Sequence, residues 1–475
     1  MVTHKMSITN QNKVVILIVP LPLQGHLNQL LHLSRLISTY NVPVHVITTT
    51  TYGRQAKLRL QGWDPNTISN IYFHDYPIPS YASPPPNPNS ANKFPSHLLP
   101  ICEAATHLRG PVAALLHKLG PTTQRLVIIH DSLMGSVVQD FILIPNAESY
   151  TFHSVSAFSI ALYISKQVGE QIQKSIEPQA LTRELISFEG CFSLEFKTFI
   201  SSQHEYTKLS LGRIYNSCRV VEQATLDLLE ANARNNNKLL WALGPFNPVD
   251  IKSGSKVSRN DGGQVAKCLN WLDKQSPNTV IYVSFGTTTT LSQDQIIEIA
   301  IGLEKSDQKF IWVVREADKG DIFVNNSTHV ELPEGFEDKV EDRGFIVKEW
   351  APQLEILAHS SIGGFMSHCG WNSCMESISM GVPIAAWPIH SDQPNNAVLV
   401  TKVLKVGLLV KEWCQQDEVV ESIVVENAVR TLMGSRDGEE IRKRAMVMGH
   451  RVRKSTGDGG VSQMELESFI RHLSR

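Results

Sequence analysis

The sequence has no excess of charge of one sign. Its 44 Lys and Arg residues nearly balance 46 Asp and Glu residues, so the formal net charge of the 475-residue chain is −2. A near-neutral chain offers no strongly basic surface for nucleic acid or an anionic membrane. Apolar residues make up 42% and charged residues 19%, which is typical of a packed globular protein and not of a disordered one.

Paired cysteines and long apolar runs are also absent. The seven cysteines are odd in number and form no CxxC pair, which argues against a disulfide framework or a zinc knuckle and favours a reducing compartment, the cytoplasm. No apolar run approaches about 18 residues, so we expect no membrane span. The apolar run 14–19 is too short for a signal peptide, and the glycosylation sequons within 325–328 are therefore interpreted as a polar surface loop.

The common nucleotide and hydrolase motifs are missing as well. The sequence contains no P-loop, no dinucleotide-binding glycine pattern and no G-x-S-x-G nucleophile elbow. It also contains no D-x-D and no H-E-x-x-H motif. We therefore expect a protein without a catalytic metal and without a bound cofactor.

The first half of the chain has a pattern typical of a parallel sheet. The apolar run 14–20 is continuous and not alternating, which predicts a strand buried on both faces. A turn at 22–26, leucines at helical spacing over 27–37, a strand over 42–50 and another over 126–132 follow. Strands that alternate with helices indicate a sheet covered by helices on both faces.

A proline-rich segment at 76–100 interrupts this pattern. It contains six prolines within 77–88, followed by Pro95 and Pro100. Proline lacks an N–H and fixes its own φ, so we expect no regular structure in the segment. A loop of this length in a compact domain is usually functional or mobile.

The second half repeats the architecture without repeating the sequence. Residues 247–263 are rich in Ser, Gly, Asn, Asp and Lys and predict a linker. A strand over 280–286 runs into a glycine turn, a helix over 292–304 follows, and the segments KFIWVVRE, GFIVKEW, IGGFM and VPIAAWP predict further strands. The fold class is thus α/β, with two domains that face each other across a cleft at the carboxyl ends of their strands.

The most informative stretch is 350–393, which contains the residues of an anion site. His368 lies in a glycine-flanked turn, and Asn372 and Ser373 follow where a helix is expected to begin. Helix N-termini bind anions through free N–H groups and the helix dipole, and a neighbouring His could add a proton or a positive charge. This arrangement predicts a diphosphate site built without lysine or metal.

Further residues of the same stretch suit a nucleotide sugar. Trp350 at a strand end offers a flat face to a base, and Glu376 could accept a hydrogen bond from a ribose hydroxyl. Asp392 and Gln393 end another loop and suit a polyhydroxylated ring. Each feature alone is more often structural, but together they would converge on one cleft.

These 44 residues closely resemble the signature box of the plant family-1 UDP-sugar glycosyltransferases. The resemblance extends over nearly the whole chain and is greatest to the zeatin O-glycosyltransferase group, through LQGHLNQLLHLS, SPPPNPN, FPSHLLP, HDSLM, YVSFGTTT, ADKGDIF and GGFMSHCGWNSC. It implies the GT-B fold of two Rossmann-like domains, with the acceptor on an N-terminal domain (1–246) and the UDP-sugar on a C-terminal domain (264–455). It also implies a linker at 247–263 and a C-terminal helix, about 456–475, that packs back on the first domain.

The resemblance also implies a set of roles within the donor site. Trp350 would stack on uracil, with Ala351 and Gln353 at the edge of the base, and Glu376 would hold the ribose. The diphosphate would lie against His368, Asn372, Ser373 and the region of Thr287, and the sugar against Trp371, Asp392 and Gln393, with Ser154 as a further possible sugar contact.

His26 is the candidate catalytic base for an inverting transfer. It follows the first strand at the start of a helix, on the carboxyl-end face where ligands bind in this architecture. A neutral imidazole is a suitable base near pH 7, and Asp131, which ends another strand, could fix its tautomer. His130 points to the opposite face of its strand and is interpreted as structural. Many relatives read Gly-His-x-x-Pro, whereas this chain has Gln29 in place of the proline.

We therefore predict that the protein is a glycosyltransferase, and we compare this prediction with two other classes of protein, a binding protein and a hydrolase. We expect metal-independent transfer of a sugar, preferably glucose, from a UDP-sugar to a hydroxyl of a zeatin-like cytokinin or a phenolic or flavonoid, by a monomer. A flavonoid C-glycosyltransferase that uses the same His base is the alternative within the class. A non-catalytic nucleotide-sugar binding protein would not need the His26–Asp131 pair, and a hydrolase would need an elbow or oxyanion motif that the sequence lacks.

Overall fold

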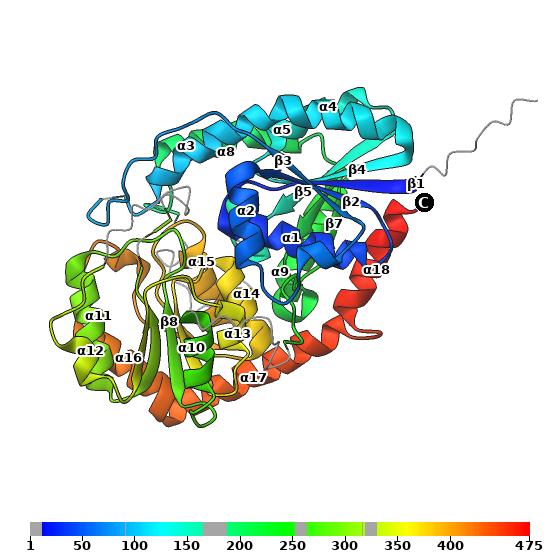
Figure 1. Cartoon of the computed structure of the whole chain (residues 1–475). Helices are drawn as coiled ribbons and strands as arrows, with labels where there is room; N and C mark the ends of the chain where they lie inside the picture. Colours follow the sequence, from blue (N-terminus) through cyan, green and yellow to red (C-terminus); the bar gives the residue numbers. More distant parts are fainter. Residues whose placement is uncertain (1–11, 91, 165–187, 252–263, 316, 319–329) are drawn as a thin grey trace, which may run out of the picture.

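The computed structural model describes residues 12–90, 92–164, 188–251, 264–315, 317–318 and 330–475, which form two bodies, each built on a parallel β-sheet (Figure 1). Within these residues the first sheet has the strand order β3-β2-β1-β4-β5-β6-β7 and the second the order β10-β9-β8-β11-β12-β13. The first consists of β1 (Asn12–Val19), β2 (Val44–Thr49), β3 (Ile71–Tyr76), β4 (Thr123–Asp131), β5 (Ala147–His153), β6 (Gly212–Tyr215) and β7 (Leu239–Ala242). The second consists of β8 (Val280–Ser284), β9 (Lys309–Val313), β10 (Gly344–Val347), β11 (Ile362–Ser367), β12 (Ile384–Ala386) and β13 (Gly407–Leu409).

Helices connect the parallel strands in both bodies, as parallel pairing requires. The first body contains α1 (Gln24–Ser38), α2 (Thr50–Arg59), α3 (Leu99–Ala105), α4 (Arg109–Leu119), α5 (Gly135–Val138), α6 (Ala157–Ile164), α8 (Leu194–Thr207) and α9 (Arg219–Asn235). The rest of the chain contains α10 (Gln264–Leu272), α11 (Gln293–Ser306), α12 (Phe336–Lys339), α13 (Gln353–Leu357), α14 (Trp371–Met380), α15 (Gln393–Val398), α16 (Ser422–Gly434), α17 (Arg436–Thr456) and α18 (Val461–Leu473). The predicted α/β class and the strands expected in both halves are confirmed.

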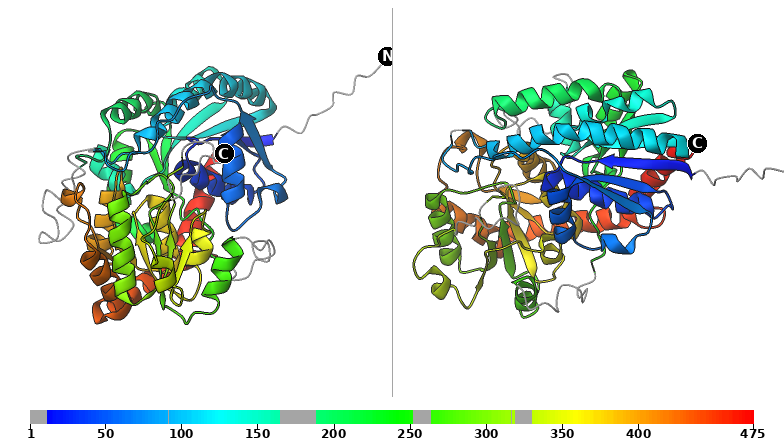
Figure 2. Two further views of the ribbon diagram at one scale, coloured as in Figure 1. Left: turned by 60° about the vertical axis from the view of Figure 1, so that its left-hand side comes forward. Right: turned by 45° about the horizontal axis from the view of Figure 1, so that its top comes forward.

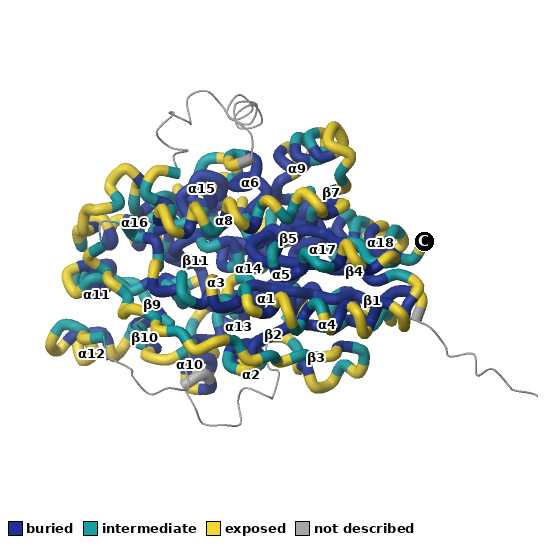
Figure 3. The backbone as a smooth tube through the Cα atoms, turned by 90° about the horizontal axis from the view of Figure 1, so that it is seen from above, coloured by how far each residue is buried: buried dark blue, intermediate teal, exposed yellow. Residues whose placement is uncertain are grey.

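The strand β1 shows why its continuous apolar run forms the centre of a sheet. Alternate side chains of a strand point to opposite faces. Val14, Ile16 and Ile18 pack with α1 and α18 on one face, whereas Val15 and Leu17 pack with the α3–α4 region and α8 on the other. Both faces are therefore buried, and the strands of the two sheets are mostly dark blue in Figure 3.

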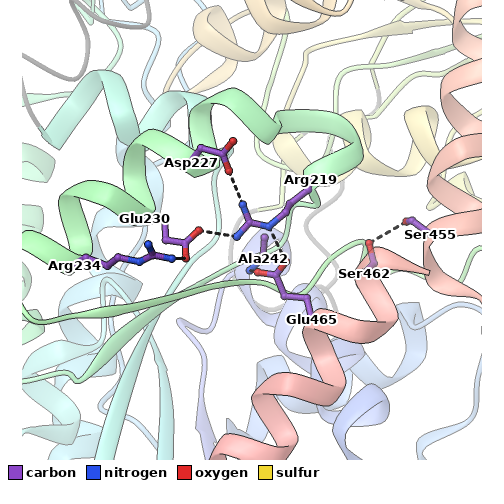
Figure 4. Close-up of polar contacts among 8 residues, drawn as sticks. All are labelled: Arg219, Asp227, Glu230, Arg234, Ala242, Ser455, Ser462 and Glu465. Atoms are coloured by element: carbon purple, nitrogen blue, oxygen red, sulfur yellow. Dashed lines mark hydrogen bonds and ion pairs between the residues drawn. The ribbon is translucent and has the colours of Figure 1, made fainter. Parts of the chain in front are cut away.

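The C-terminal helices connect the two bodies. Figures 1 and 2 show α17 running along the second body and α18 ending beside the first sheet. Figure 4 shows how α18 is held: the Glu465 carboxylate accepts from the Arg219 guanidinium at 3.1 Å and from the Ala242 N–H at 2.9 Å. Arg219 also pairs with Asp227 and Glu230 on its own helix, α9. The last helix thus belongs, by its contacts, to the first body.

The proline-rich segment differs slightly from its prediction. After β3 ends at Tyr76, the described residues show no helix or strand until the short 3₁₀ turn Ser96–Leu98. The helix α3 then begins at Leu99 and includes Pro100, which we expected to lie in irregular structure. Proline is tolerated in the first turn of a helix, where its missing N–H has no intrahelical partner to lose.

Some predictions from composition can be compared with the structure. All seven cysteines lie among the described residues and are free thiols, and only Cys414 is exposed. Within the described ranges, no helix has both the length and the apolar character needed to cross a bilayer. Most of the predicted linker, 252–263, and the sequons within 325–328 lie outside the described residues.

Candidate active site

The site lies where the strand order of each sheet reverses direction. In the first sheet, β1 and β4 are neighbours whose connections leave in opposite directions, and His26 follows β1 while Asp131 ends β4. In the second sheet, β8 and β11 are the corresponding neighbours, and Ser284 pairs with Ser367 just before His368. Ligands of open parallel sheets bind at such crevices, and here both crevices open into one shared cavity.

The His26 imidazole and the Asp131 carboxylate form a direct pair. The Nδ1 of His26 lies 2.7 Å from Oδ2 of Asp131, and the carboxylate is fully buried. The other carboxylate oxygen accepts from the Leu133 N–H at 2.9 Å, which fixes its orientation. With Nδ1 engaged, Nε2 remains available to a hydroxyl group in the cavity that His26 lines.

The electrostatics of this pair favour proton uptake by His26. Burial opposes the charged imidazolium, but the charge and hydrogen bond of Asp131 outweigh it and raise the pKa of His26 above its usual 6.5. Asp392, from the second body, adds to the same effect. His26 can therefore accept a proton from an acceptor hydroxyl and hold it beside a carboxylate.

His130, next to Asp131, is placed as a structural residue. It is 1% exposed, and its ring nitrogens lie 2.9 Å from the Asp131 carbonyl oxygen and 3.1 Å from Oγ of Ser210. Burial lowers the pKa of His130 to about 4. His130 does not line the cavity. It precedes Asp131 on β4, and because consecutive strand residues face opposite ways, His130 points away from His26.

The anion site is built around the first turn of α14, although its cap differs from the prediction. Gly370 is the N-cap residue, without a side-chain cap, and α14 begins at Trp371. Asn372 and Ser373 therefore lie in the first helical turn and not at the cap. The Asn372 amide instead donates to the Gly25 carbonyl oxygen of the first body at 2.8 Å.

His368 lies against this turn in a space that glycine leaves open. Burial lowers the pKa of His368 to about 4, so the ring is neutral near pH 7 and does not carry the positive charge that we considered. A Cβ on Gly286, which has φ +79°, would lie 2.7 Å from Nε2 of His368. A neutral imidazole and the N–H groups of α14 can still hold an anion by hydrogen bonds.

The residues predicted to bind the nucleoside, Trp350, Ala351, Gln353 and Glu376, line the same cavity. Trp350 and Ala351 lie in the loop between β10 and α13. The Gln353 amide donates to Ser373 Oγ at 3.0 Å and to Glu376 Oε2 at 2.7 Å. Burial raises the pKa of Glu376 to about 7, against the opposing hydrogen bond from Gln353. In either protonation state this carboxyl has an oxygen that can accept a hydrogen bond from a hydroxyl group.

Asp392 and Gln393 also line the cavity, and Asp392 is near enough to His26 to raise the pKa of that imidazole. Burial raises the pKa of Asp392 to about 6, although Asn396 donates to its carboxylate at 2.7 Å. The Gln393 side-chain oxygen accepts from two backbone N–H groups, those of residues 389 and 390, so this amide also shapes its own loop.

Three other predicted sugar and phosphate contacts also line the cavity. Trp371 is 3% exposed and its side chain packs in a hydrophobic core, and its indole N–H donates to the Asn216 carbonyl oxygen at 2.8 Å, which leaves its backbone to contact a sugar. Ser154 follows β5, and its carbonyl oxygen accepts from Gln29 at 2.8 Å. Thr287 follows β8, and its carbonyl oxygen accepts from the Asp318 N–H at 2.8 Å. The structure thus brings every predicted site residue except Asp131 to the lining of this one cavity, and Asp131 is connected to it through its contact with His26.

The sequence led us to expect that Phe94, after the proline-rich loop, would close an apolar wall over an aromatic ring near His26, but we missed the part of this wall that the segment 188–204 supplies. Phe94 stacks on Phe196 with ring centroids 4.4 Å apart, and Phe192 lies 5.9 Å from Phe196. A signal was available, since an apolar or aromatic residue recurs every fourth position from Phe188 to His204. This spacing predicts one face of a helix, and the wall is completed by Leu98, Leu99, Cys102, Leu133, Ile160, Tyr163 and Ile200.

Contacts between the two bodies were also missed. Arg59 of α2 pairs with Asp318 of the second body at 2.6 Å, and both side chains are largely buried. Arg315 reaches the same carboxylate. The Gln61 side-chain oxygen accepts from the Leu354 N–H at 2.9 Å. No local pattern signals the contacts of Arg59 and Gln61, because their partners are 259 and 293 positions away.

A metal centre was not predicted, and the described ranges contain no group of three or more His, Cys, Asp or Glu side chains arranged to hold an ion. The polar groups near the anion site are the neutral His368, the Asn372 amide and the Ser373 hydroxyl. These are hydrogen-bonding groups of the kind that bind phosphate oxygens at helix N-termini.

Comparison with known families adds an independent finding. A family model described as "Glycosyltransferase, N-terminal domain" matches residues 12–248, and one described as "UDP-glucoronosyl and UDP-glucosyl transferase" matches residues 260–448. The zeatin O-glucosyltransferase of Phaseolus lunatus is 52% identical, with all of both chains covered. The zeatin O-xylosyltransferase of Phaseolus vulgaris is 50% identical over 99% of this chain and 100% of its own.

Solved structures agree with the architecture. The crystal structure of Medicago truncatula UGT71G1 complexed with UDP-glucose has a TM-score of 0.75 at 26% identity, over 99% of this chain and 100% of that one. A UGT transferase from Siraitia grosvenorii in complex with UDP has the same TM-score at 27% identity, over 98% and 100%. The two-sheet arrangement described above is therefore shared with proteins crystallised with UDP or a UDP-sugar.

Proposed function

The chain belongs to the UDP-glycosyltransferase family, and on that premise we propose that it transfers glucose from UDP-glucose to a hydroxyl group of a zeatin-like cytokinin or a phenolic compound. The observation that carries this proposal is that His26, held by the buried Asp131 carboxylate, and the donor residues of the second body line one cavity. A non-catalytic binding protein would not need a buried carboxylate to orient a cavity-facing imidazole.

The reaction follows from the positions of these groups. His26 Nε2 takes the proton of the acceptor hydroxyl while the acceptor oxygen attacks the anomeric carbon of the sugar. The bond from that carbon to the UDP oxygen breaks on the opposite side, so the configuration inverts. Asp131 stabilises the imidazolium that forms, and the N–H groups of α14 with His368, Asn372 and Ser373 stabilise the charge of departing UDP.

The donor assignments extend the same proposal. Trp350 stacks on uracil beside Ala351 and Gln353, Glu376 binds the ribose, and Thr287 lies near the diphosphate. Trp371, Asp392 and Gln393 hold the sugar, with Ser154 as a further contact. The position of Asp392 near His26, which its effect on the pKa of His26 reflects, supports placing the sugar between the two bodies.

The acceptor class is supported by the chemistry of the cavity wall. Stacked aromatic rings such as Phe94 and Phe196 suit a planar ring. His204 lies at one end of the wall, 6.0 Å from the Tyr163 ring. Burial, and to a smaller extent the positive charge of Arg213, lowers the pKa of His204. Its neutral imidazole therefore presents one hydrogen-bond donor and one acceptor. A purine edge has the same mixture of donors and acceptors.

We also propose the organisation of the chain around this site. Residues 1–246 would bind the acceptor and 264–455 the donor, with 247–263 as the linker and 456–475 returning to the first domain; the contacts of Glu465 with Arg219 and Ala242 support the last point. A monomer without a cofactor, in the reducing cytoplasm, fits the single-chain site and the free thiols.

One assay tests the proposal and its alternatives. Trans-zeatin, cis-zeatin and a flavone are supplied at equal concentration with UDP-glucose or UDP-xylose, and products are identified by mass spectrometry. We expect a zeatin O-glucoside that β-glucosidase cleaves. Turnover of the flavone alone, to a product that resists acid and glucosidase, would indicate a C-glycosyltransferase. UDP-sugar binding without any product would indicate a binding protein.

A further inference from the structure

Gln29 is a buried glutamine whose side chain connects three segments around the catalytic pair. It is 3% exposed and lies on α1, one turn after His26. Its amide nitrogen donates to the Gly25 carbonyl oxygen at 2.9 Å and to the Ser154 carbonyl oxygen at 2.8 Å. Its amide oxygen accepts from the Asn216 side chain at 3.0 Å. Both N–H groups and the oxygen of the amide are therefore used.

Two of the three partners of Gln29, Gly25 and Ser154, line the cavity, and the third, Asn216, contacts the cavity residue Trp371. Gly25 precedes the base His26, and Ser154 is a candidate sugar contact. Asn216 continues the connection, because its side-chain oxygen accepts from the Phe246 N–H at 2.9 Å, where the chain leaves the first body. The backbone carbonyl of Asn216 accepts from the indole N–H of Trp371 at 2.8 Å.

The Gly25 carbonyl oxygen connects this hydrogen-bond network of the first body to the second body. It accepts from Gln29 within the first body and from the Asn372 amide of the second body at 2.8 Å. Asn372 has a second amide N–H, which a phosphate oxygen can use at the same time. A UDP-sugar bound to Asn372 would thus be connected, through the Gly25 carbonyl group, to the backbone next to His26.

We propose that Gln29 is a positioning residue, which holds the His26 loop, the Ser154 loop and the Trp371 anchor of the donor domain in the geometry needed for transfer. This inference rests on the proposed function. The network joins base and donor side chains that come from different bodies, and a misplacement of about 1 Å between reacting groups can lower turnover about 100-fold. Gln29 also lines the cavity, but its amide N–H groups and oxygen are engaged by these partners, so it takes no part in bond making.

The test compares Gln29→Met with a matched control, Gln295→Met. Gln295 on α11 is also buried, at 6% exposure, and also bonds to backbone groups, with its nitrogen 3.0 Å from the Val420 carbonyl oxygen and its oxygen 2.9 Å from the Val420 N–H. Neither Gln295 nor Val420 lines the cavity. Both variants remove the hydrogen bonds of a buried glutamine at nearly constant side-chain volume, so both are expected to lower Tm by a comparable amount.

The expected result is a difference in turnover. With UDP-glucose and the best acceptor from the screen above, kcat of Gln29→Met falls about 10- to 100-fold, while kcat of Gln295→Met stays within about twofold of the unsubstituted chain. The Kd for UDP, measured by calorimetry, stays within about threefold in both. Gln29→Glu serves as a second variant that keeps the acceptor for Asn216 but removes both N–H donors, and it is expected to lose kcat in the same way.

Two outcomes separate this inference from the proposed function. No sugar transfer by the unsubstituted chain to any acceptor would overturn the proposed function. Transfer by the unsubstituted chain, together with an undiminished kcat in Gln29→Met and Gln29→Glu, would overturn the role of Gln29. A kcat loss in Gln295→Met equal to that in Gln29→Met would also overturn it, because the effect would then follow from lost stability alone.

Discussion

The two bodies of this protein share an architecture but build their parts of the site differently. The donor side of the second body takes most of its residues from one stretch, 350–393, which spans consecutive strand-to-helix loops. The first body takes its residues from distant segments, since His26, Phe94 and Phe196 line the cavity and Asp131 pairs with His26. The donor site is therefore a local feature of the chain, whereas the acceptor site depends on how far-apart helices pack. Substitutions on the two sides should therefore have separate effects on kcat, on the KM for the donor and on the KM for the acceptor.

The largest effect is expected from His26→Ala in the first body. Without the imidazole no group is placed to accept the acceptor proton, so kcat falls about 10³- to 10⁴-fold, the upper range for general-base catalysis. The Kd for UDP stays within about threefold, because the donor residues lie in the second body. Steady-state kinetics and calorimetry measure the two effects. Near-normal turnover would show that His26 is not the base.

Asp131→Asn is expected to lower kcat about 100-fold and to move the pH profile. The neutral imidazole is the active form, so kcat/KM of the unsubstituted enzyme rises with pH through a pKa above 6.5, where Asp131 raises it. Without that charge, burial lowers the pKa of His26 and only the smaller effect of Asp392 opposes it, so the acidic limb moves to lower pH. If the acidic limb of the kcat/KM profile lies at the same pH in Asp131→Asn, the result would contradict the pairing of His26 with Asp131.

Glu376→Gln tests the donor side and should affect binding more than chemistry. The KM for UDP-glucose is expected to rise about tenfold, with kcat changed less than threefold. Burial raises the pKa of Glu376 to about 7, so ionisation of this carboxyl destabilises the folded protein progressively as the pH rises from about 4.5 to 7. The variant should therefore have the higher Tm at pH 8 and the same Tm at pH 4. A lower Tm of the variant at pH 8 would contradict this view.

Phe196→Leu tests the acceptor side, with a smaller effect. An aromatic contact is worth about 1 kcal/mol beyond its buried area, so the acceptor KM is expected to rise about fivefold while the KM for UDP-glucose is unchanged. Ile299→Leu in the buried core of α11 is the control for altered packing away from the cavity. Equal acceptor KM values in the two variants would place the acceptor elsewhere.

The smallest effect is expected from chelation. The diphosphate is proposed to bind to α14, His368, Asn372 and Ser373, which are hydrogen-bond donors. Preincubation with EDTA should therefore change the initial rate of transfer by less than about twofold. A complete loss of activity that Mg²⁺ or Mn²⁺ restores would show that these groups do not suffice for the leaving diphosphate.

The sequence by itself determined the α/β class, the two parallel sheets and the nature of the donor segment. Continuous apolar strands and helical spacing are local patterns, and so is a glycine-flanked His followed by Asn and Ser at a helix start. His26 and Asp131 could also be paired in advance, because parallel strands place their carboxyl ends on one edge of a sheet. Burial on both faces makes such strands easy to recognise in a sequence.

Only the tertiary structure decided which polar atoms meet across the two bodies and what forms the acceptor wall. Asn372 donates to Gly25 and not to its own helix terminus, His368 is held neutral by burial, and Gln29 joins three segments. The aromatic wall combines Phe94 with Phe196, about a hundred positions apart. Such contacts depend on the packing of side chains between distant helices. The spacing over 188–204 predicts a helix face, but no local pattern indicates which distant residues that face or these polar groups contact.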